Sequence, residues 1–81
     1  MINELESAVL TVDLPEYGLK AGDIGTVVLV HRGGEGYEVE FMTLDGDTIA
    51  IVTLDADQVK PERGEAVPHA RPLSLPRAGS D

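Results

Sequence analysis

The chain has 81 residues, a formal net charge of −9 and no cysteine, so it can form one small domain that neither disulfide bonds nor a thiolate metal site can stabilise. Residues 1–60 hold twelve acidic and three basic side chains, a balance that repels nucleic-acid backbones and anionic lipids and favours basic or neutral partners. The first ten residues contain two acids and no base, unlike a secretory signal, and no apolar run approaches the roughly 20 residues that span a bilayer, so we expect a cytoplasmic protein without a membrane segment.

The first predicted strand covers residues 8–14, in which Ala, Leu and Val alternate with Val9, Thr11 and Asp13. Pro15 cannot donate a hydrogen bond to a strand ladder, and the Pro-Glu-Tyr-Gly sequence that it begins is typical of a turn. We therefore expect a long connection from Pro15 to the next strand.

The second strand is predicted over residues 25–31, after a glycine-rich loop. Gly22 and Gly25 allow a left-handed backbone or the close approach of another strand, and Asp23 between them can accept a hydrogen bond within its own turn. The nearly continuous apolar character of residues 25–31 indicates either a strand buried on both sides or a strand that bends from one layer to another.

The third strand, residues 37–41, has the clearest alternation in the chain. Its glutamates, Glu38 and Glu40, are predicted to face water, as expected when one side of an antiparallel sheet is covered. The side chains predicted to face the core are Tyr37, Val39 and Phe41.

Asp45-Gly46 predicts a tight hairpin with a primed turn, and residues 48–53 return as the fourth strand. Asp55 can then cap a single 3₁₀ turn within residues 54–59, and the last strand is predicted at residues 59–60.

Pro61 ends the predicted domain, which covers residues 1–61. Residues 62–81 are rich in Pro, Ala, Arg and Ser and contain few large apolar side chains. We therefore predict that they form a flexible, disordered C-terminal tail.

Five short strands, hairpin turns and one 3₁₀ turn before the last strand predict an all-β fold, a small five-stranded SH3-like barrel. The strings LKAGDIGTVV at residues 19–28, YEVEF at residues 37–41 and QVKP at residues 58–61 resemble an uncharacterised bacterial family of short acidic chains, the domain of unknown function 4926. The resemblance covers residues 8–61 and implies an SH3-like barrel. It implies no catalytic residue, because the family has no assigned activity.

Residues 19–27 also resemble, more weakly, the KOW element of barrels that contact RNA. Such contacts need basic side chains along the binding groove, and Lys20 and Arg32 are the only bases near these loops. Direct nucleic-acid binding is therefore not expected, and the resemblance gives an alternative function: an accessory component of a nucleic-acid-handling complex that binds through protein contacts.

No residue pattern predicts catalysis or the binding of a cofactor or metal. His31 ends a strand beside a glycine loop, and His69 lies in the predicted tail, where nothing would hold its geometry. We therefore expect each to be a solvated side chain and not a catalytic base. The carboxylates that could gather around a hard cation do not have the spacing of an EF-hand loop, and turn and cap roles explain them. They are Asp45, Asp47, Asp55 and Asp57.

The best candidate for a partner-binding surface is an acidic ridge formed by Glu38 and Glu40 with Glu35 nearby. Tyr17 is the one aromatic residue expected to present its ring from a loop. A basic protein could bind this ridge through charge complementarity, and an open strand edge could pair with a second chain. We therefore predict a non-catalytic protein-interaction module that binds a basic partner or self-associates; an ordinary solvated strand face is the alternative.

Overall fold

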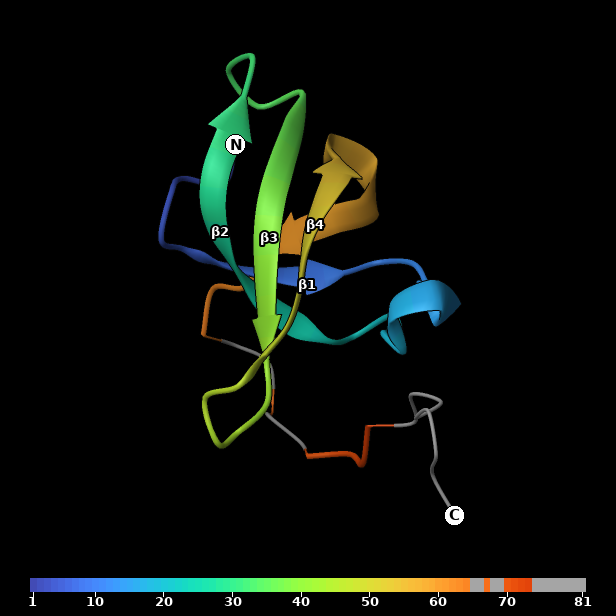
Figure 1. Cartoon of the computed structure of the whole chain (residues 1–81). Coiled ribbons are helices and arrows are strands. Elements are labelled where there is room, and N and C mark those ends of the chain that lie inside the picture. Colours follow the sequence, from blue (N-terminus) through green and yellow to red (C-terminus); the bar gives the residue numbers. More distant parts are fainter. Residues whose placement is uncertain (65–66, 68–69, 74–81) are drawn as a thin grey trace.

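The computed structural model describes residues 1–64, 67 and 70–73, which contain one antiparallel sheet of five strands in the order β4-β3-β2-β1-β5 (Figure 1). The strands are β1 (Ser7–Leu10), β2 (Ile24–His31), β3 (Gly36–Met42), β4 (Thr48–Asp55) and β5 (Val59–Pro61). Two 3₁₀ turns, η1 (Pro15–Tyr17) and η2 (Ala56–Gln58), lie in the connections. The predicted all-β fold of five strands is confirmed, and η1 is an additional 3₁₀ turn where the sequence predicted a simple turn.

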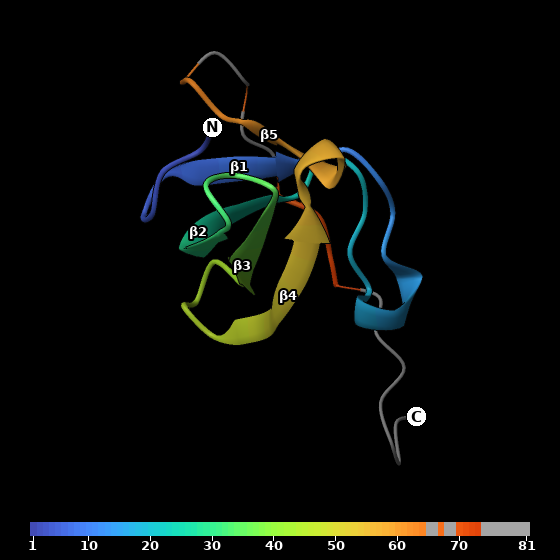
Figure 2. The same ribbon diagram turned by 90° about the horizontal axis from the view of Figure 1, so that it is seen from above.

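The sheet owes its curvature to β2. The first residues of β2, from Ile24 to Thr26, pair with β1, whereas the stretch from Thr26 to His31 pairs with β3. β1 consequently crosses behind β2 and β3 in Figure 1, and Figure 2 shows the strands curving around the core from β5 and β1 to β4. Of the two predicted explanations for the apolar β2 sequence, the strand that bends between layers is therefore correct.

The core is mainly aliphatic and is centred on β3. Tyr37, Val39 and Phe41 are buried, as predicted from the alternation of this strand. The Tyr37 hydroxyl accepts a hydrogen bond of 3.1 Å from the backbone N–H of Ile2, so its polar atom is satisfied inside the core and the N-terminal segment is fixed to it. The other buried hydrophobic residues are Ile2, Ala8, Val9, Leu10, Leu19, Val27, Val52, Leu54 and Val59.

Gly25 lies at the bend of β2, where another chain segment comes very close. A Cβ atom at this position would lie 2.6 Å from Val39 Cγ1 and 2.8 Å from the carbonyl oxygen of Glu40. Gly22, by contrast, has a φ of +97° in open space. The two glycines thus serve the two roles predicted for them, close approach at Gly25 and a left-handed turn at Gly22.

β1 ends at Leu10, earlier than the predicted Leu14. The backbone N–H of Thr11 donates to the carbonyl of Gln58 at 2.9 Å, and the Thr11 hydroxyl donates to the carbonyl of Asp57 at 2.9 Å. These bonds direct the chain toward η2 and away from the strand ladder. Val12 and Leu14 still pack against the core, so the alternation reflects burial of side chains and not strand pairing.

The β3–β4 hairpin also differs from its prediction. The N–H of Thr43 donates to the carbonyl of Asp47 at 2.8 Å, and the N–H of Gly46 donates to the carbonyl of Thr43 at 3.0 Å. Gly46 has a φ of +90°, while Asp45 is not among the residues with positive φ. The loop is therefore a turn followed by a left-handed glycine, because a primed turn would also have required the strained conformation at Asp45.

Residues 62–64, 67 and 70–73 contain no helix or strand. The rest of the predicted disordered tail, residues 65–66, 68–69 and 74–81, lies outside the described residues.

We expect Gly25→Ala to destabilise the fold by about 1–3 kcal/mol, the usual cost of overpacking, because Val39 and the β3 backbone must move to admit the methyl group. Urea unfolding measures this loss. Gly33→Ala is a suitable comparison, because Gly33 lies in open space and the added methyl group would cause only the backbone strain of a φ of +68°. An equal or smaller loss at Gly25 would contradict the close approach.

Phe41→Ala should lower the free energy of unfolding by about 3–5 kcal/mol, because it leaves a cavity in the centre of a small core. The neighbouring Met42 is exposed, and Met42→Ala should cost less than about 1 kcal/mol. Similar unfolding midpoints for the two variants in urea would contradict the inward orientation of Phe41.

Candidate interaction surface

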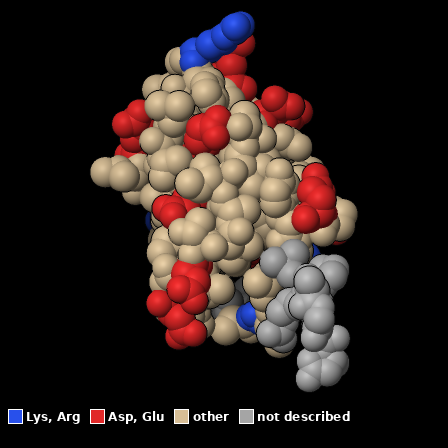
Figure 3. All heavy atoms as spheres, viewed as in Figure 1, with Lys and Arg blue, Asp and Glu red and all other residues tan. Residues whose placement is uncertain are grey.

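The outer face of β2, β3 and β4 presents two rows of side chains, defined by the strand register. Directly opposed residues of neighbouring strands point to the same side of a sheet. One row consists of Leu29, Glu38 and Thr53, and the other of Thr26, Glu40 and Ile51. Figure 3 views this face and shows separate acidic groups around a largely uncharged centre.

Glu38 is held in place by neighbours on both sides. The hydroxyl of Thr53 donates to Glu38 Oε2 at 2.8 Å, and Nε2 of His31 lies 2.6 Å from the same oxygen. The hydrogen bond with His31 and, next in importance, the one from Thr53 lower the pKa of Glu38 below its ordinary value. Glu38 therefore presents a fixed, ionised carboxylate at neutral pH.

Glu40 is fixed in a similar way. The hydroxyl of Thr48 donates to Glu40 Oε2 at 2.7 Å. Both glutamates of β3 are thus oriented by uncharged hydroxyl groups of β4. Side chains that are already ordered lose less conformational entropy when a partner binds.

Leu29 and Ile51 bring apolar surface to the same two rows, with 44% and 56% of their surface exposed. The register shifts between Val27 and Leu29, which leaves Val28 as the extra residue of a β-bulge. Simple alternation from the buried Val27 would place Leu29 in the core, and the bulge turns it outward. Ile51 faces outward because its neighbour Val52 occupies the core.

The other two predicted partner residues lie apart from these rows. Glu35 is exposed in the β2–β3 connection, where its carbonyl accepts a hydrogen bond of 3.2 Å from the N–H of Ala56. Tyr17 is exposed on η1, in the β1–β2 connection. The structure therefore groups Glu38 with Glu40 on one face, and it does not bring Tyr17 to that face.

Sequence reasoning missed Leu29 and Ile51. The alternation along β4 could have identified Ile51 as an outward-facing residue, because Val52 and Leu54 face inward. No comparable signal marks Leu29, because the bulge that exposes it is not visible in the residue types of β2.

Within residues 1–64, 67 and 70–73, no three or more His, Asp or Glu side chains form a group that could hold a metal ion. In the same part of the chain, no helix has the length and apolar character needed to cross a bilayer.

Comparison with known proteins gives one family. The family described as a domain of unknown function (DUF4926) matches residues 4–61. No curated protein and no solved structure matches the chain, so the likeness to SH3-like and KOW-containing barrels rests on sequence motifs.

The lowered pKa of Glu38 predicts an acid-sensitive contribution to stability. In the unfolded chain the Glu38 carboxyl keeps its higher, ordinary pKa, so protons bind the unfolded chain more readily than the folded one. The contribution of Glu38 to the free energy of unfolding is therefore complete above the ordinary pKa, and it is lost as the pH falls through the lower pKa of the folded chain. We expect the stability difference between wild type and Glu38→Gln to shrink as the pH falls below about 4.5, the ordinary pKa of the carboxyl group. Thermal unfolding at a series of pH values above and below this point measures it.

Thr53→Val is the matched comparison, since it removes one hydrogen bond to Glu38 Oε2 and leaves the carboxylate. In that background the pH-dependent part of the difference should be smaller. A difference that stays constant with pH would contradict the bonded arrangement of Glu38.

Proposed function

This chain belongs to the DUF4926 family, whose description assigns no activity, and we propose that it is a non-catalytic interaction module that binds a basic protein through the outer face of β2–β4. The observation that carries the proposal is the arrangement of this face. Two exposed aliphatic side chains, Leu29 and Ile51, share its rows with two fixed carboxylates, Glu38 and Glu40.

The mixture of side chains on this face favours a protein as the partner. Protein interfaces combine apolar contacts with hydrogen bonds. Leu29 on β2 and Ile51 on β4 can supply apolar contacts on either side of β3. Glu38 and Glu40 can accept hydrogen bonds from lysine or from the planar guanidinium of arginine, which pairs well with carboxylates.

The charge of the domain favours a partner that is basic. Residues 1–60 carry twelve acidic and three basic side chains, so a partner rich in lysine and arginine would be attracted over the whole approach, and its association rate would rise. A second copy of this chain fits the face less well, because the same glutamates would meet across the interface.

Direct binding of nucleic acid is disfavoured by the positions of the two bases near the KOW-like segment as well as by their number. Lys20 lies before β2 and Arg32 lies after it, so they flank opposite ends of one strand and form no continuous basic track. The KOW-like alternative would therefore operate through a protein partner within a nucleic-acid complex.

The test is capture of partners from a lysate of the source organism by wild type and two face variants, Ile51→Lys and the double variant Glu38→Lys/Glu40→Lys. Leu5→Lys is the matched control, because Leu5 is 81% exposed before β1 and lies outside the two rows. We expect one basic protein to bind wild type and the control, to be lost from both face variants, and to dissociate at about 0.5 M salt, where exposed charges are strongly screened.

All variants should remain folded, since the changed side chains lie on the surface, and thermal unfolding checks this. Retention of the partner by both face variants would contradict the proposal. Capture that nuclease treatment abolishes would instead support the alternative of a nucleic-acid complex. A concentration-dependent dimer that ultracentrifugation detects, with no other partner, would support self-association.

A further inference from the structure

A groove of about 510 Å³ lies between one end of the barrel and the C-terminal segment. On the barrel side, Ile24, Met42 and Leu44 line it, and on the other side Val67 and Leu73. Its volume is in the range of ordinary ligand sites, and its walls are mainly apolar. This groove is separate from the rows of Leu29, Glu38, Glu40 and Ile51.

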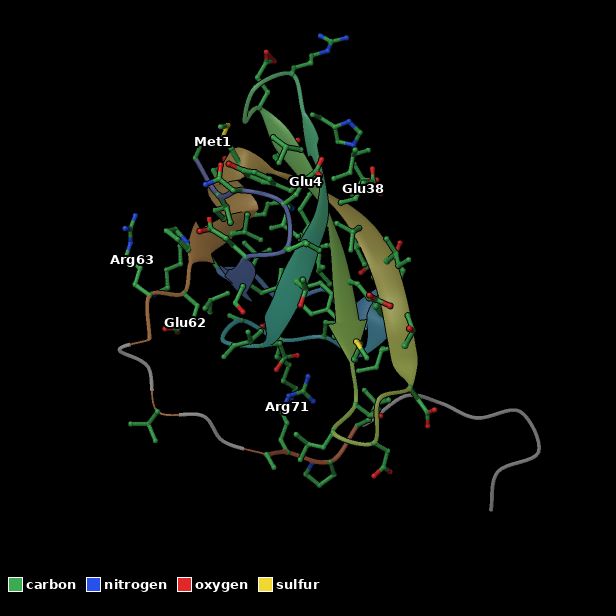
Figure 4. All side chains as sticks on the ribbon, turned by 90° about the vertical axis from the view of Figure 1, so that its left-hand side faces the viewer. Met1, Glu4, Glu38, Glu62, Arg63 and Arg71 are labelled. Atoms are coloured by element: carbon green, nitrogen blue, oxygen red, sulfur yellow. The ribbon has the colours of Figure 1, made fainter. Side chains whose placement is uncertain are left out.

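The C-terminal segment is anchored beside this groove by Arg71. Nε of Arg71 donates to Asp23 Oδ1 at 2.9 Å, and Nη2 donates to Asp23 Oδ2, which completes a two-bond pairing of guanidinium and carboxylate. Nη2 also donates to the carbonyl oxygen of Gly18 at 3.0 Å. Figure 4 shows the Arg71 side chain extending from the segment toward the end of the barrel.

The pairing is partly shielded from water, with 23% of the Arg71 side chain and 17% of the Asp23 side chain exposed. The hydrogen bond to Asp23 raises the pKa of Arg71. Two-bond pairing with a carboxylate and a further bond to a carbonyl use the planar geometry of a guanidinium, which the ammonium group of lysine does not reproduce.

The barrel itself holds the two acceptors in place. Asp23 Oδ2 accepts a hydrogen bond of 2.8 Å from the backbone N–H of Lys20, and the N–H of Asp23 donates to the carbonyl of Lys20 at 2.9 Å. Gly18, with a φ of 70°, ends η1, and reciprocal hydrogen bonds between Leu14 and Leu19 close the loop around it. All these residues precede residue 62, so the arginine site is built without the segment that fills it.

We propose that this end of the barrel is a binding site for a peptide that carries an arginine followed by proline and an aliphatic residue. The chain's own Arg71 occupies the site, with its guanidinium on Asp23 and Gly18, and Leu73, two residues further on, lines the groove. The same sequence supplied by a separate peptide competes for this site. Linkage within one chain gives the internal segment an effective concentration on the order of millimolar, so it is the normal occupant.

The experiment follows backbone amide signals by NMR in the full chain. In Arg71→Ala, the signals of Gly18, Gly22 and Asp23 should shift, because the guanidinium leaves their acceptors. A peptide with the sequence of residues 67–73 should then shift these signals back toward their wild-type positions and reach saturation. The same peptide should bind wild type at least about tenfold more weakly, because the internal segment competes with it.

Two controls separate the arginine site from general charge effects. Arg63→Ala removes the same charge outside the groove and should leave the three amides unshifted. A peptide with lysine in place of the arginine should bind Arg71→Ala at least about tenfold more weakly than the arginine peptide. Asp23→Asn retains an oxygen for the Lys20 N–H and should abolish peptide binding while the amides of the sheet keep their positions.

Unchanged amides of Gly18 and Asp23 in Arg71→Ala would overturn the proposal. So would failure of the arginine peptide to bind that variant, or equal binding of the lysine peptide. Ile51→Lys lies on the outer face of β2–β4 and should leave peptide binding intact. The result for this groove is therefore independent of the result for the basic partner.

Discussion

The bend of β2 is the constraint on which the rest of the structure depends. One strand must pair with β1 at its beginning and with β3 along the remainder, and this is possible because Gly25 lets the β3 backbone and the Val39 side chain approach where any Cβ would collide. Closing the sheet in this way allows a core with only two buried aromatic rings, Tyr37 and Phe41, to exclude water. The glycine is therefore required by packing and not by an unusual backbone angle.

The same strand positions both the outer face of β2–β4 and the arginine site at the end of the barrel. The bulge at Val28 turns Leu29 outward beside Glu38, and so gives the outer face part of its apolar surface. The loop that precedes β2 ends in Asp23, which meets Arg71 at the end of the barrel. A substitution at the bend would thus disturb both surfaces. A substitution at Ile51 would disturb the outer face alone, and one at Arg71 would disturb the arginine site alone.

Period-two patterns and turn residues predicted much of the fold from the sequence. The inward set of β3, the 3₁₀ turn after Asp55 and the separate roles of Gly22 and Gly25 depend on local preferences, and the structure confirms them. The bulge at Val28 and the early end of β1 depend on partners elsewhere in the chain, as when Thr11 bonds to η2. The Asp23–Arg71 pair spans 48 residues, and no local pattern joins two side chains so far apart.

The partners of the carboxylates distinguish the two surfaces electrostatically. On the outer face, Glu40 is held by the hydroxyl of Thr48, and Glu38 by the hydroxyl of Thr53 and the His31 ring. The hydroxyl of Thr48 orients Glu40 without cancelling its charge, so this carboxylate retains its negative field toward an approaching partner. At the end of the barrel, by contrast, Arg71 compensates the charge of Asp23. A basic protein would therefore be drawn to the outer face first, whereas the groove would attract such a ligand only after Arg71 has left Asp23.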